Sequence, residues 1–540
     1  LFRSYIPIMS FNKDQESSIE QIYKFLSPLN PAQLFLLNGA AGTGKTYVIS
    51  HLFNDERFKA KRIAFTAPTN KAVSIIRLLN PIVSKNVSYI TTHKLLGITR
   101  QIEDDGSINF RENDTPSQSN GDTLEKVDYV IIDEASMVSQ SIYETLLKKL
   151  RTTRNPVKVI FVGDIHQLPP VNEDISSVFS KVKTKSNLSI IERYKNSIVT
   201  YANSIRNNIR IKKSQLGEDV IFMKDENVWL DNYIKNYQDS IILAYTNKKV
   251  DNLNNRIRNT LFDNVNHKFN TNEKIVFNNY YYYDTNNFYS SQIGIITNLV
   301  TNHLELQQFP KRHLMNSKIS KDNKDDNVLT KTKKLEEPCP ICYEEDIDDC
   351  SKTACGHNFC SGCIKLWLEN HNQCPMCRFD IKTNGEIEIK NDTQLTELVN
   401  EFCNLTQNKL LKVYHLTIDI ENENNRDIIV LHEDSQEEYD TLKNKFIDIL
   451  TKMKKSVYKR SRNYFNKQLL ISLWNFYYDK YVDIFANISY GYAMTVHKSQ
   501  GSTYKNVYLH LKNIMINKHE LKQCIYTGVT RASNSIKVMT

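Results

Sequence analysis

Short apolar runs alternate with longer amphipathic stretches through the first 260 residues of the chain. Continuous apolar runs between helical stretches are typical of buried parallel strands in an α/β sheet. In such sheets the functional residues lie where the strands end, and here those positions are polar or glycine. The pattern therefore predicts an α/β protein with its chemistry at the carboxyl edge of the sheet. The apolar runs lie at 34–37, 62–65, 129–132, 159–162 and 241–245.

Three further segments depart from this pattern or repeat it. Residues 98–126 are polar and contain an Asp-Asp-Gly turn at 104–106, which predicts a small inserted hairpin. Residues 311–334 are rich in Lys, Asn and Asp with few apolar residues, which predicts a flexible linker. Another strand-to-loop unit, with apolar residues at 506–509 and 536–539, closes the chain.

Eight potential metal ligands are gathered between residues 339 and 377. Their spacing is Cys-x2-Cys-x12-Cys-x1-His-x2-Cys-x2-Cys-x10-Cys-x2-Cys. Because each zinc ion takes four tetrahedral sulfur or nitrogen ligands, eight ligands in close pairs predict two Zn²⁺ ions. Such clustering, in a chain without an expected secretion signal, indicates metal in a reducing compartment and not disulfides. The expected ligands are Cys339, Cys342, Cys355, His357, Cys360, Cys363, Cys374 and Cys377.

Composition narrows the classes of protein that fit. The 540 residues contain no apolar run approaching about 18 residues, so neither a transmembrane helix nor a membrane partner is expected. Residues 1–5 contain no apolar leader, and the first residue is Leu, which is compatible with a trimmed chain. A net charge of +9 permits a nucleic-acid partner without requiring one. We expect an intracellular, reducing location, with the nucleus, the cytoplasm and a viral replication site as candidates.

A phosphate-binding loop is predicted directly after the first apolar run. Residues 39–46 read GAAGTGKT and precede a helical stretch. Glycines let such a loop turn its backbone N–H groups toward phosphate oxygens, while the Lys reaches the β- and γ-phosphates and the Thr hydroxyl joins Mg²⁺. The alternative, a Gly-rich turn without a ligand, is disfavoured by the strand before the loop and the helix after it. The nucleotide-binding residues are Gly39, Ala40, Ala41, Gly42, Thr43, Gly44, Lys45 and Thr46.

An acidic pair, Asp133 and Glu134, closes the apolar run at 129–132. Beside a phosphate loop, Asp133 is positioned to hold Mg²⁺ through water, and Glu134 to accept a proton from the attacking water. Taken alone, an acidic pair at a strand end is usually a solvated turn, and this is the alternative interpretation.

Three longer motifs resemble a known family. Residues 163–170 read GDIHQLPP and resemble helicase motif III; residues 490–501 read YGYAMTVHKSQG and resemble motif V; residues 526–532 read YTGVTRA and resemble motif VI. Together with the phosphate loop and the acidic pair they resemble superfamily 1 helicases of the RecD type, whose known members mostly translocate 5′→3′. The resemblance implies ATP and Mg²⁺ as cofactors, and a DNA helicase acting in replication, repair or recombination.

The resemblance also implies roles for four residues outside the phosphate loop. Gln167 would sense the γ-phosphate, and Arg531 would reach ATP from a second core as an arginine finger. Gln15 takes the position of the adenine-reading glutamine, with a surface residue as the alternative. Arg193 lies where motif IV supplies another arginine, with a surface ion pair as the alternative. The implied catalytic residues are Lys45, Thr46, Asp133, Glu134, Gln167, Arg193 and Arg531.

In this family single-stranded DNA lies across the tops of both cores. Residues 67–72 resemble motif Ia and residues 91–97 resemble motif Ib, and motif V faces them across the cleft. Amides, hydroxyls and histidines of this kind suit phosphates and bases, so little sequence specificity is expected. The implied partners are single-stranded DNA and forked duplex DNA. The implied contacts are Pro68, Thr69, Asn70, Thr92, His93, Thr495, His497 and Lys498.

The resemblance implies an α/β fold class with two RecA-like parallel-sheet cores and a small β-barrel-like insertion. The expected units are a first core at 1–190, a second core at 191–261 and 484–540, a partly SH3-like insertion at 262–337 and 381–483, and a zinc finger at 338–380.

The cysteine cluster resembles a RING finger. Interleaved pairing in that family would give Cys339, Cys342, Cys360 and Cys363 to one ion, and Cys355, His357, Cys374 and Cys377 to the other. The family's ubiquitin ligases grip a ubiquitin-conjugating enzyme with side chains that match Ile341, Trp367, Pro375 and Arg378. The presence of all four favours ligase activity over a purely structural zinc knob. The finger has three basic and seven acidic residues at 339–380, whereas the whole chain is basic.

The sequence therefore predicts an ATP-dependent DNA helicase with an inserted RING finger that is a ubiquitin ligase. One rival is an ATP-driven translocase that remodels protein–DNA complexes without separating strands. Another is a recruitment platform whose ATPase is vestigial and whose RING only binds proteins.

Overall fold

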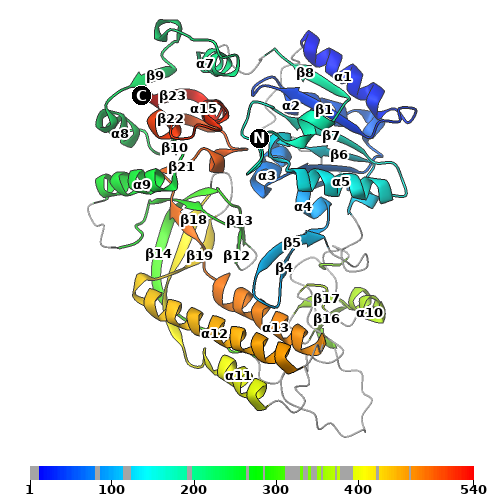
Figure 1. Ribbon diagram of the computed structural model, residues 1–540, viewed down its shortest axis with the longest axis vertical. Helices are drawn as coiled ribbons and strands as arrows, with labels where there is room; N and C mark the ends of the chain where they lie inside the picture. Colours follow the sequence, from blue (N-terminus) through cyan, green and yellow to red (C-terminus); the bar gives the residue numbers. More distant parts are fainter. Residues whose placement is uncertain are drawn as a thin grey trace.

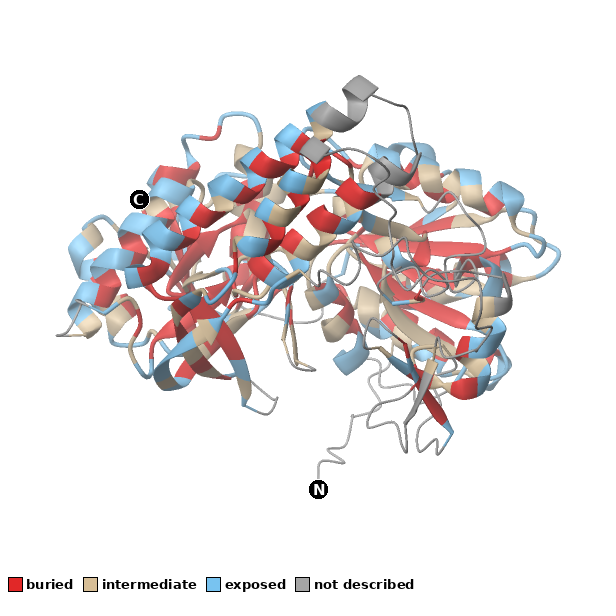
Figure 2. Ribbon diagram, turned by 90° about the horizontal axis from the view of Figure 1, so that it is seen from below, coloured by how far each residue is buried: buried red, intermediate tan, exposed pale blue. Residues whose placement is uncertain are grey.

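The computed structural model describes residues 11–79, 85–112, 123–190, 197–262, 267–283, 286–309, 329–332, 339–341, 349–353, 357–370, 374–376, 393–420, 425–460 and 464–540. Over these residues the chain forms two parallel sheets, an antiparallel sheet and a small three-stranded sheet (Figure 1). The predicted fold class, α/β with two RecA-like cores, an insertion and a finger, is confirmed. Figure 2 shows the inner strands of the two parallel sheets as buried, whereas the helices bury one face and expose the other.

The first core is a six-stranded, all-parallel sheet. Its strands carry the apolar runs seen in the sequence, and the central strand β7 is buried along its whole length. Helices α1 to α3 pack on one face and helices α4 to α6 on the other. In sheet order the strands are β3 (Val87–Thr91), β2 (Ile63–Ala67), β6 (Tyr129–Ile132), β7 (Lys158–Gly163), β1 (Leu34–Gly39) and β8 (Lys185–Leu188). The helices are α1 (Lys13–Leu26), α2 (Lys45–Phe53), α3 (Asn70–Leu79), α4 (Thr92–Leu95), α5 (Gln140–Thr152) and α6 (Ser177–Lys181).

The second core is a five-stranded parallel sheet assembled from two distant parts of the chain. Helices α7, α14 and α15 pack on one face and helices α8 and α9 on the other. In sheet order the strands are β21 (Ala493–Thr495), β10 (Ser240–Ala244), β22 (Tyr504–His510), β23 (Ala532–Met539) and β9 (Val220–Met223). The helices are α7 (Ser197–Arg206), α8 (Glu226–Ile234), α9 (Asn247–Leu261), α14 (Leu511–Ile514) and α15 (Leu521–Val529).

The insertion between these two parts is a five-stranded antiparallel sheet capped by helices. Strand β20 falls within the range 484–540 that the sequence assigned to the second core, but it pairs with β11 in this sheet. In sheet order the strands are β19 (Arg426–Leu431), β18 (Leu410–Asp419), β14 (Ile293–Glu305), β11 (Lys274–Phe277) and β20 (Ile488–Tyr490), with a separate hairpin of β12 (Tyr281–Tyr283) and β13 (Asn286–Phe288). The helices are α11 (Thr393–Asn404), α12 (Gln436–Arg460), α13 (Tyr464–Tyr477) and the π-helix η7 (Tyr478–Val482).

A hairpin links the first core to the insertion helices. Strands β4 (Ile98–Ile102) and β5 (Ile108–Glu112) form it within the segment where a hairpin was expected. At its tip, the Trp474 indole donates to the Asp104 carbonyl at 3.3 Å, and the Tyr478 hydroxyl donates to the Gly106 carbonyl at 2.8 Å. Gly106 has φ +80°, and a Cβ there would lie 2.6 Å from the Trp474 ring, so both backbone and space require glycine.

The finger contains strands β15 (Leu329–Thr332), β16 (Cys350–Thr353) and β17 (Asn358–Cys360), followed by helix α10 (Ser361–Asn370). Strand β15 lies inside the segment 311–334 that was predicted to be a linker; it pairs with β16, because Leu329 packs on the apolar centre of the finger. The rest of that segment lies outside the described residues. Among the described helices, none combines the length and the apolar character that a bilayer-spanning helix needs.

Candidate nucleotide, DNA and zinc sites

The phosphate loop lies between β1 and α2, at the carboxyl edge of the first sheet. Gly42 and Gly44 have φ values of +83° and +81°, which favour glycine. The Lys45 ammonium donates to the carbonyls of Gly39 at 2.8 Å and Ala40 at 3.0 Å, so it lies folded against its own loop. No side chain caps the start of α2, and the first-turn amides of this helix are therefore available to an anion.

Gln15 is buried against this loop, which argues against the alternative of a surface residue. Its side chain accepts from the Asn12 amide at 3.2 Å and donates to the Thr43 carbonyl at 3.1 Å. A Cβ on Gly44 would lie 2.6 Å from the Gln15 Nε2 atom, so the two positions are tightly packed. Gln15 therefore fixes the loop from α1, and adenine recognition by it stays a prediction.

The acidic pair lies at the end of β6, beside the phosphate loop. Removal from water, together with the charge of Glu134, raises the pKa of Asp133 above that of an ordinary carboxylic acid. Glu134 has φ 52° and ψ 45°, an unusual conformation for a residue with a side chain. Two adjacent carboxylates held in this way fit a divalent cation, which would compensate their mutual repulsion. Asp133 and the Thr46 hydroxyl are the residues that would hold Mg²⁺.

Gln167 and Arg531 belong to different cores. Gln167, after β7, is buried, and its Oε1 atom has no hydrogen-bond partner among the described residues. Arg531, after α15, is also buried, and its guanidinium donates to the carbonyls of Thr527 at 3.2 Å and Ser502 at 3.0 Å. Gln167 is therefore a buried polar group at the carboxyl edge of the first sheet, whereas Arg531 is held at the amino end of β23 in the second sheet. Arg193 lies outside the described residues.

Hydrogen bonds join the two cores next to these residues. The Leu168 amide donates to the Thr527 hydroxyl at 3.1 Å, and the Gln500 side chain donates to the Leu168 carbonyl at 3.2 Å. The Tyr526 hydroxyl donates to Asp164 at 2.7 Å. The sequence analysis assigned no role to Tyr526 or Thr527, although both lie in the segment that resembles motif VI. The segment at 163–170 therefore contacts both motif-like segments of the second core.

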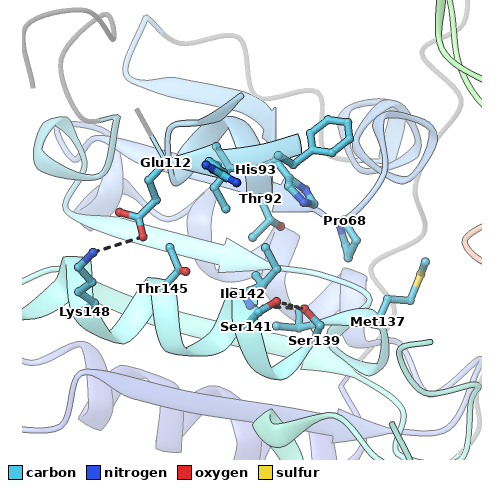
Figure 3. A pocket seen from close by; sticks show the side chains of 14 residues that line it. Pro68, Thr92, His93, Glu112, Met137, Ser139, Ser141, Ile142, Thr145 and Lys148 are labelled. Atoms are coloured by element: carbon cyan, nitrogen blue, oxygen red, sulfur yellow. Dashed lines mark hydrogen bonds and ion pairs between the residues drawn. The ribbon is translucent and has the colours of Figure 1, made fainter. Parts of the chain in front are cut away.

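A cavity of about 720 Å³ lies beside the segments that resemble motifs Ia and Ib. Figure 3 shows Pro68, Thr92 and His93 facing side chains of α5 across it. Thr92 is buried, and its hydroxyl has no hydrogen-bond partner among the described residues. Burial lowers the pKa of His93, so its ring is neutral at pH 7. An ion pair between Lys148 and Glu112, 3.6 Å apart, closes one end of the cavity.

Other residues that were predicted to contact DNA form hydrogen bonds or ion pairs within the protein. The Thr69 hydroxyl accepts from the Ala72 amide at 3.2 Å and so caps α3, whose first residue is Asn70. Across the cleft, the Lys498 ammonium donates to Asn278 at 3.0 Å, and the Thr495 hydroxyl accepts from the Lys498 amide at 3.3 Å. The His497 ring lies 3.4 Å from the Glu520 carboxylate.

The sequence analysis also missed Lys71. Its ammonium, on α3 of the first core, donates to the Ser291 carbonyl of the insertion at 2.7 Å. Removal from water lowers the pKa of Lys71 to about 8. Lys71 could have been identified from the sequence, because it directly follows Asn70 within the segment that resembles motif Ia. A cation bridging the first core and the insertion is suited to a phosphate that passes between them.

In the finger, the described ligands fall into two groups. The sulfur atoms of Cys339, Cys360 and Cys363 all lie within 4.8 Å of one another. The Cys374 sulfur lies 3.7 Å from the Nδ1 atom of His357. Both groups agree with the interleaved pairing, and thiolate and imidazole donors fit Zn²⁺. Cys342, Cys355 and Cys377 lie outside the described residues.

Three of the four expected partner-binding residues are described. Ile341 and Trp367 pack partly against the buried centre of the finger, and Pro375 follows Cys374. All three are half-buried, so each keeps some surface for a partner. Nearby, Leu366 is 65% exposed and Met376 is 55% exposed, which extends the apolar surface. Arg378 lies outside the described residues.

Three family models match the chain. An AAA domain matches residues 26–173, a Ring finger domain matches residues 337–378, and a UvrD-like helicase C-terminal domain matches residues 490–537. The first match covers most of the first core, the third covers the C-terminal part of the second core, and the second coincides with the cysteine cluster. The two cores therefore resemble those of RecD-like superfamily 1 helicases, and the segment inserted between the two parts of the second core matches the Ring finger model.

Curated relatives and a solved structure are similar to the chain over different spans. Uncharacterized protein R530 of Acanthamoeba polyphaga mimivirus is 26% identical over 98% of this chain and 99% of its own length. RecBCD enzyme subunit RecD of Buchnera aphidicola is 28% identical over 44% of this chain, which spans 41% of that relative. Probable E3 ubiquitin-protein ligase HIP1 of Oryza sativa is 51% identical over 45 residues, 8% of this chain and 7% of its own length. The crystal structure of Pif1 helicase from Candida albicans covers 99% of this chain and 95% of its own, with 14% identity and a TM-score of 0.44.

Proposed function

We propose that the chain is an ATP-dependent DNA helicase that translocates 5′→3′ on single-stranded DNA. The observation that carries the proposal is the set of hydrogen bonds between the two cores. Leu168, which follows Gln167, contacts both Thr527 and Gln500 of the second core. A nucleotide bound on the first core would therefore change the contacts that hold the second core. The proposed polarity rests on the resemblance to RecD-type helicases.

The proposed roles in hydrolysis follow the chemistry of each group. Lys45 would hold the β- and γ-phosphates, Thr46 and Asp133 would hold Mg²⁺, and Glu134 would accept the proton of the attacking water. Gln167 would sense the γ-phosphate, and its Oε1 atom, which has no partner among the described residues, would accept from the attacking water. Arg531 and Arg193 would stabilise charge on the transferred phosphoryl group. Bound Mg²⁺ neutralises developing negative charge on the phosphates.

The proposed DNA path crosses both cores. Pro68, Thr92 and His93 would contact the strand at the cavity of the first core. Lys498 and Lys71 would contact phosphates where the cores meet the insertion, since both ammonium groups bond to neutral oxygens of that insertion. The division into a first core at 1–190, a second core at 191–261 and 484–540, an insertion at 262–337 and 381–483, and a finger at 338–380 is part of this proposal. Two strands depart from it, since β15 pairs with the finger and β20 with the insertion sheet.

The test is an ATPase and unwinding assay with 5′-tailed and 3′-tailed duplexes. We expect hydrolysis stimulated by single-stranded DNA and unwinding of the 5′-tailed duplex. Unwinding of only the 3′-tailed duplex would contradict the polarity. Displacement of streptavidin from DNA without unwinding of either duplex would favour the nucleoprotein remodeller. An absence of DNA-stimulated hydrolysis would favour the recruitment platform.

We further propose that the finger binds two Zn²⁺ ions and acts as a ubiquitin ligase. The support is the match to the Ring finger model, the two ligand groups, and the partly exposed Ile341, Trp367 and Pro375. Metal analysis of the purified chain should give two zinc ions. Ubiquitin chains should form with at least one of a panel of conjugating enzymes.

Two variants separate ligase activity from the motor. Ile341→Ala should reduce chain formation by weakening the conjugating-enzyme contact, while zinc content stays at two. Cys374→Ser should lower zinc content and abolish chain formation. Lys45→Ala, the matched control, should form chains like the wild type while it loses ATPase activity. Chains that persist in both finger variants would refute the ligase proposal.

A further inference from the structure

A single tyrosine hydroxyl connects the phosphate loop, the segment after β7 and the second core. Tyr526 lies on α15, and its side chain is 1% exposed. Its hydroxyl donates to the Asp164 carboxylate at 2.7 Å and accepts from the Ala41 backbone amide at 3.4 Å. Ala41 belongs to the phosphate loop, so a group of the second core occupies an amide of the proposed nucleotide site.

The two hydrogen bonds differ in strength. The bond to Asp164 is short and has a charged acceptor, whereas the bond from Ala41 is long and has a neutral acceptor. Burial and the charge of Asp164 raise the pKa of Tyr526, so the phenol stays protonated and keeps Asp164 as its acceptor. A phosphate oxygen is anionic and accepts more strongly than a phenol oxygen. The Ala41 amide would therefore pass to phosphate when a nucleotide binds.

The helix that carries Tyr526 also carries the groups that hold Arg531. The neighbouring Thr527 hydroxyl accepts from the Leu168 amide, and the Thr527 carbonyl accepts from the Arg531 guanidinium at 3.2 Å. Tyr526 is thus the direct chain neighbour of Thr527, whose carbonyl helps to position Arg531. This places a sensor of loop occupancy on one short helix and the proposed arginine finger two residues beyond its end.

We propose that Tyr526 is a positioning residue that reports nucleotide binding in the phosphate loop to the second core. The Tyr526 hydroxyl holds both Ala41 and Asp164. A nucleotide phosphate that takes the Ala41 amide leaves the hydroxyl with Asp164 alone, so α15 loses its direct bond to the phosphate loop while it stays bonded to the segment after β7. The inference rests on the proposed ATPase function and adds a residue to its coupling.

Tyr526→Phe is the test, because it removes the hydroxyl and keeps the buried ring. Nucleotide binding then no longer competes with the phenol, so the Kd for an ATP analogue should fall about two- to fivefold, the range of one weak neutral hydrogen bond. Because Arg531 is no longer positioned by loop occupancy, kcat with saturating single-stranded DNA should fall about tenfold. KM and kcat should therefore both decrease. Tyr233→Phe removes another buried hydroxyl of the second core, bonded to the Tyr492 carbonyl at 2.9 Å, and should change neither value.

A second variant guards against a folding defect in the first. Asp164→Asn weakens the acceptor that orients the Tyr526 hydroxyl, and it should lower kcat in the same direction. The double variant should be no worse than the poorer single variant, since both act through one link. Additive losses, an unchanged nucleotide Kd in Tyr526→Phe, or a raised KM would each overturn the inference. A wild-type protein that neither binds nor hydrolyses ATP would instead refute the proposed function itself.

Discussion

The two parallel-sheet cores contain the same strand–loop–helix unit, but they use its backbone amides differently. In the first core β1 leads through the phosphate loop into α2, and no side chain caps that helix. In the second core β10 leads into α9, whose start is capped by the Thr246 hydroxyl. There the Asn513 side chain also accepts from the amides of Tyr245 and Thr246, at 2.7 and 3.0 Å.

This difference explains how two cores of the same fold can have different roles, one with a nucleotide site and the other with side chains that contact that site. A loop whose amides are satisfied by its own core has nothing to offer a phosphate, whereas the glycine-rich loop keeps amides for a ligand. The second core instead contributes side chains that reach the first, among them Tyr526 and Thr527. Substitutions made in one loop at a time test this difference.

The largest expected effect is at the phosphate loop. Lys45→Ala removes the cation that would hold the β- and γ-phosphates, and it should lower ATPase activity by about 100-fold or more. The measurement is phosphate release with saturating single-stranded DNA. Lys249→Ala is the matched control in the second core, because Lys249 lies in the first turn of α9 and pairs with Glu226 at 2.9 Å. Its ATPase activity should stay within about twofold of wild type, and an equal loss in both variants would contradict the division of roles.

A smaller effect on stability is expected in the second core. Asn513→Ala leaves the Tyr245 and Thr246 amides without their acceptor, which should lower the free energy of unfolding by about 1–3 kcal/mol. Thermal unfolding measures the change, and the nucleotide Kd should not move. Asn534→Ala, which removes an exposed amide bonded to Asn506 at 3.2 Å, should leave the melting temperature unaltered. A tighter nucleotide site in Asn513→Ala would mean that the second loop also binds phosphate.

The smallest effect concerns pH and Lys71, the cation between the first core and the insertion. Its pKa is about 8 in the folded chain and ordinarily about 10.5, so the folded state disfavours the charged form. The resulting cost to stability is fully present below pH 8 and is relieved as the pH rises toward 10.5. The affinity for DNA is instead expected to fall as the pH rises, because a phosphate pairs with the charged ammonium form of Lys71.

Between pH 7 and pH 9 the affinity of the wild type for single-stranded DNA should therefore fall about two- to threefold more than the affinity of a Lys71→Arg variant. The variant is the control because its guanidinium stays charged over this range. Fluorescence anisotropy with a labelled oligonucleotide at constant ionic strength measures the difference. Identical pH profiles for the two proteins would show that Lys71 does not contact the strand.

Local sequence patterns were sufficient for the features whose chemistry lies within a few consecutive residues. Four of the five apolar runs became strands of the first core, and the run at 241–245 became β10 of the second. The phosphate loop follows β1 because glycine spacing and helix start are both local properties. The cysteine spacing likewise predicted the finger, and the grouping of Cys339 with Cys360 and Cys363 agrees with it. The strand formed by Leu329–Thr332 was missed, because its polar sequence gains order only from pairing with β16.

The sequence by itself determined the class of this protein: two α/β cores, a phosphate loop with its acidic pair, and a zinc finger of the RING type. Only the tertiary structure decided which groups meet between the cores, because those contacts join residues more than 300 positions apart. Tyr526 reaches Ala41 and Asp164 in this way. Within the second core, Asn513 accepts from the amides of Tyr245 and Thr246, which lie 268 and 267 positions earlier in the chain. Hydrogen bonds of this kind depend on distance and burial, which no local pattern of residues specifies.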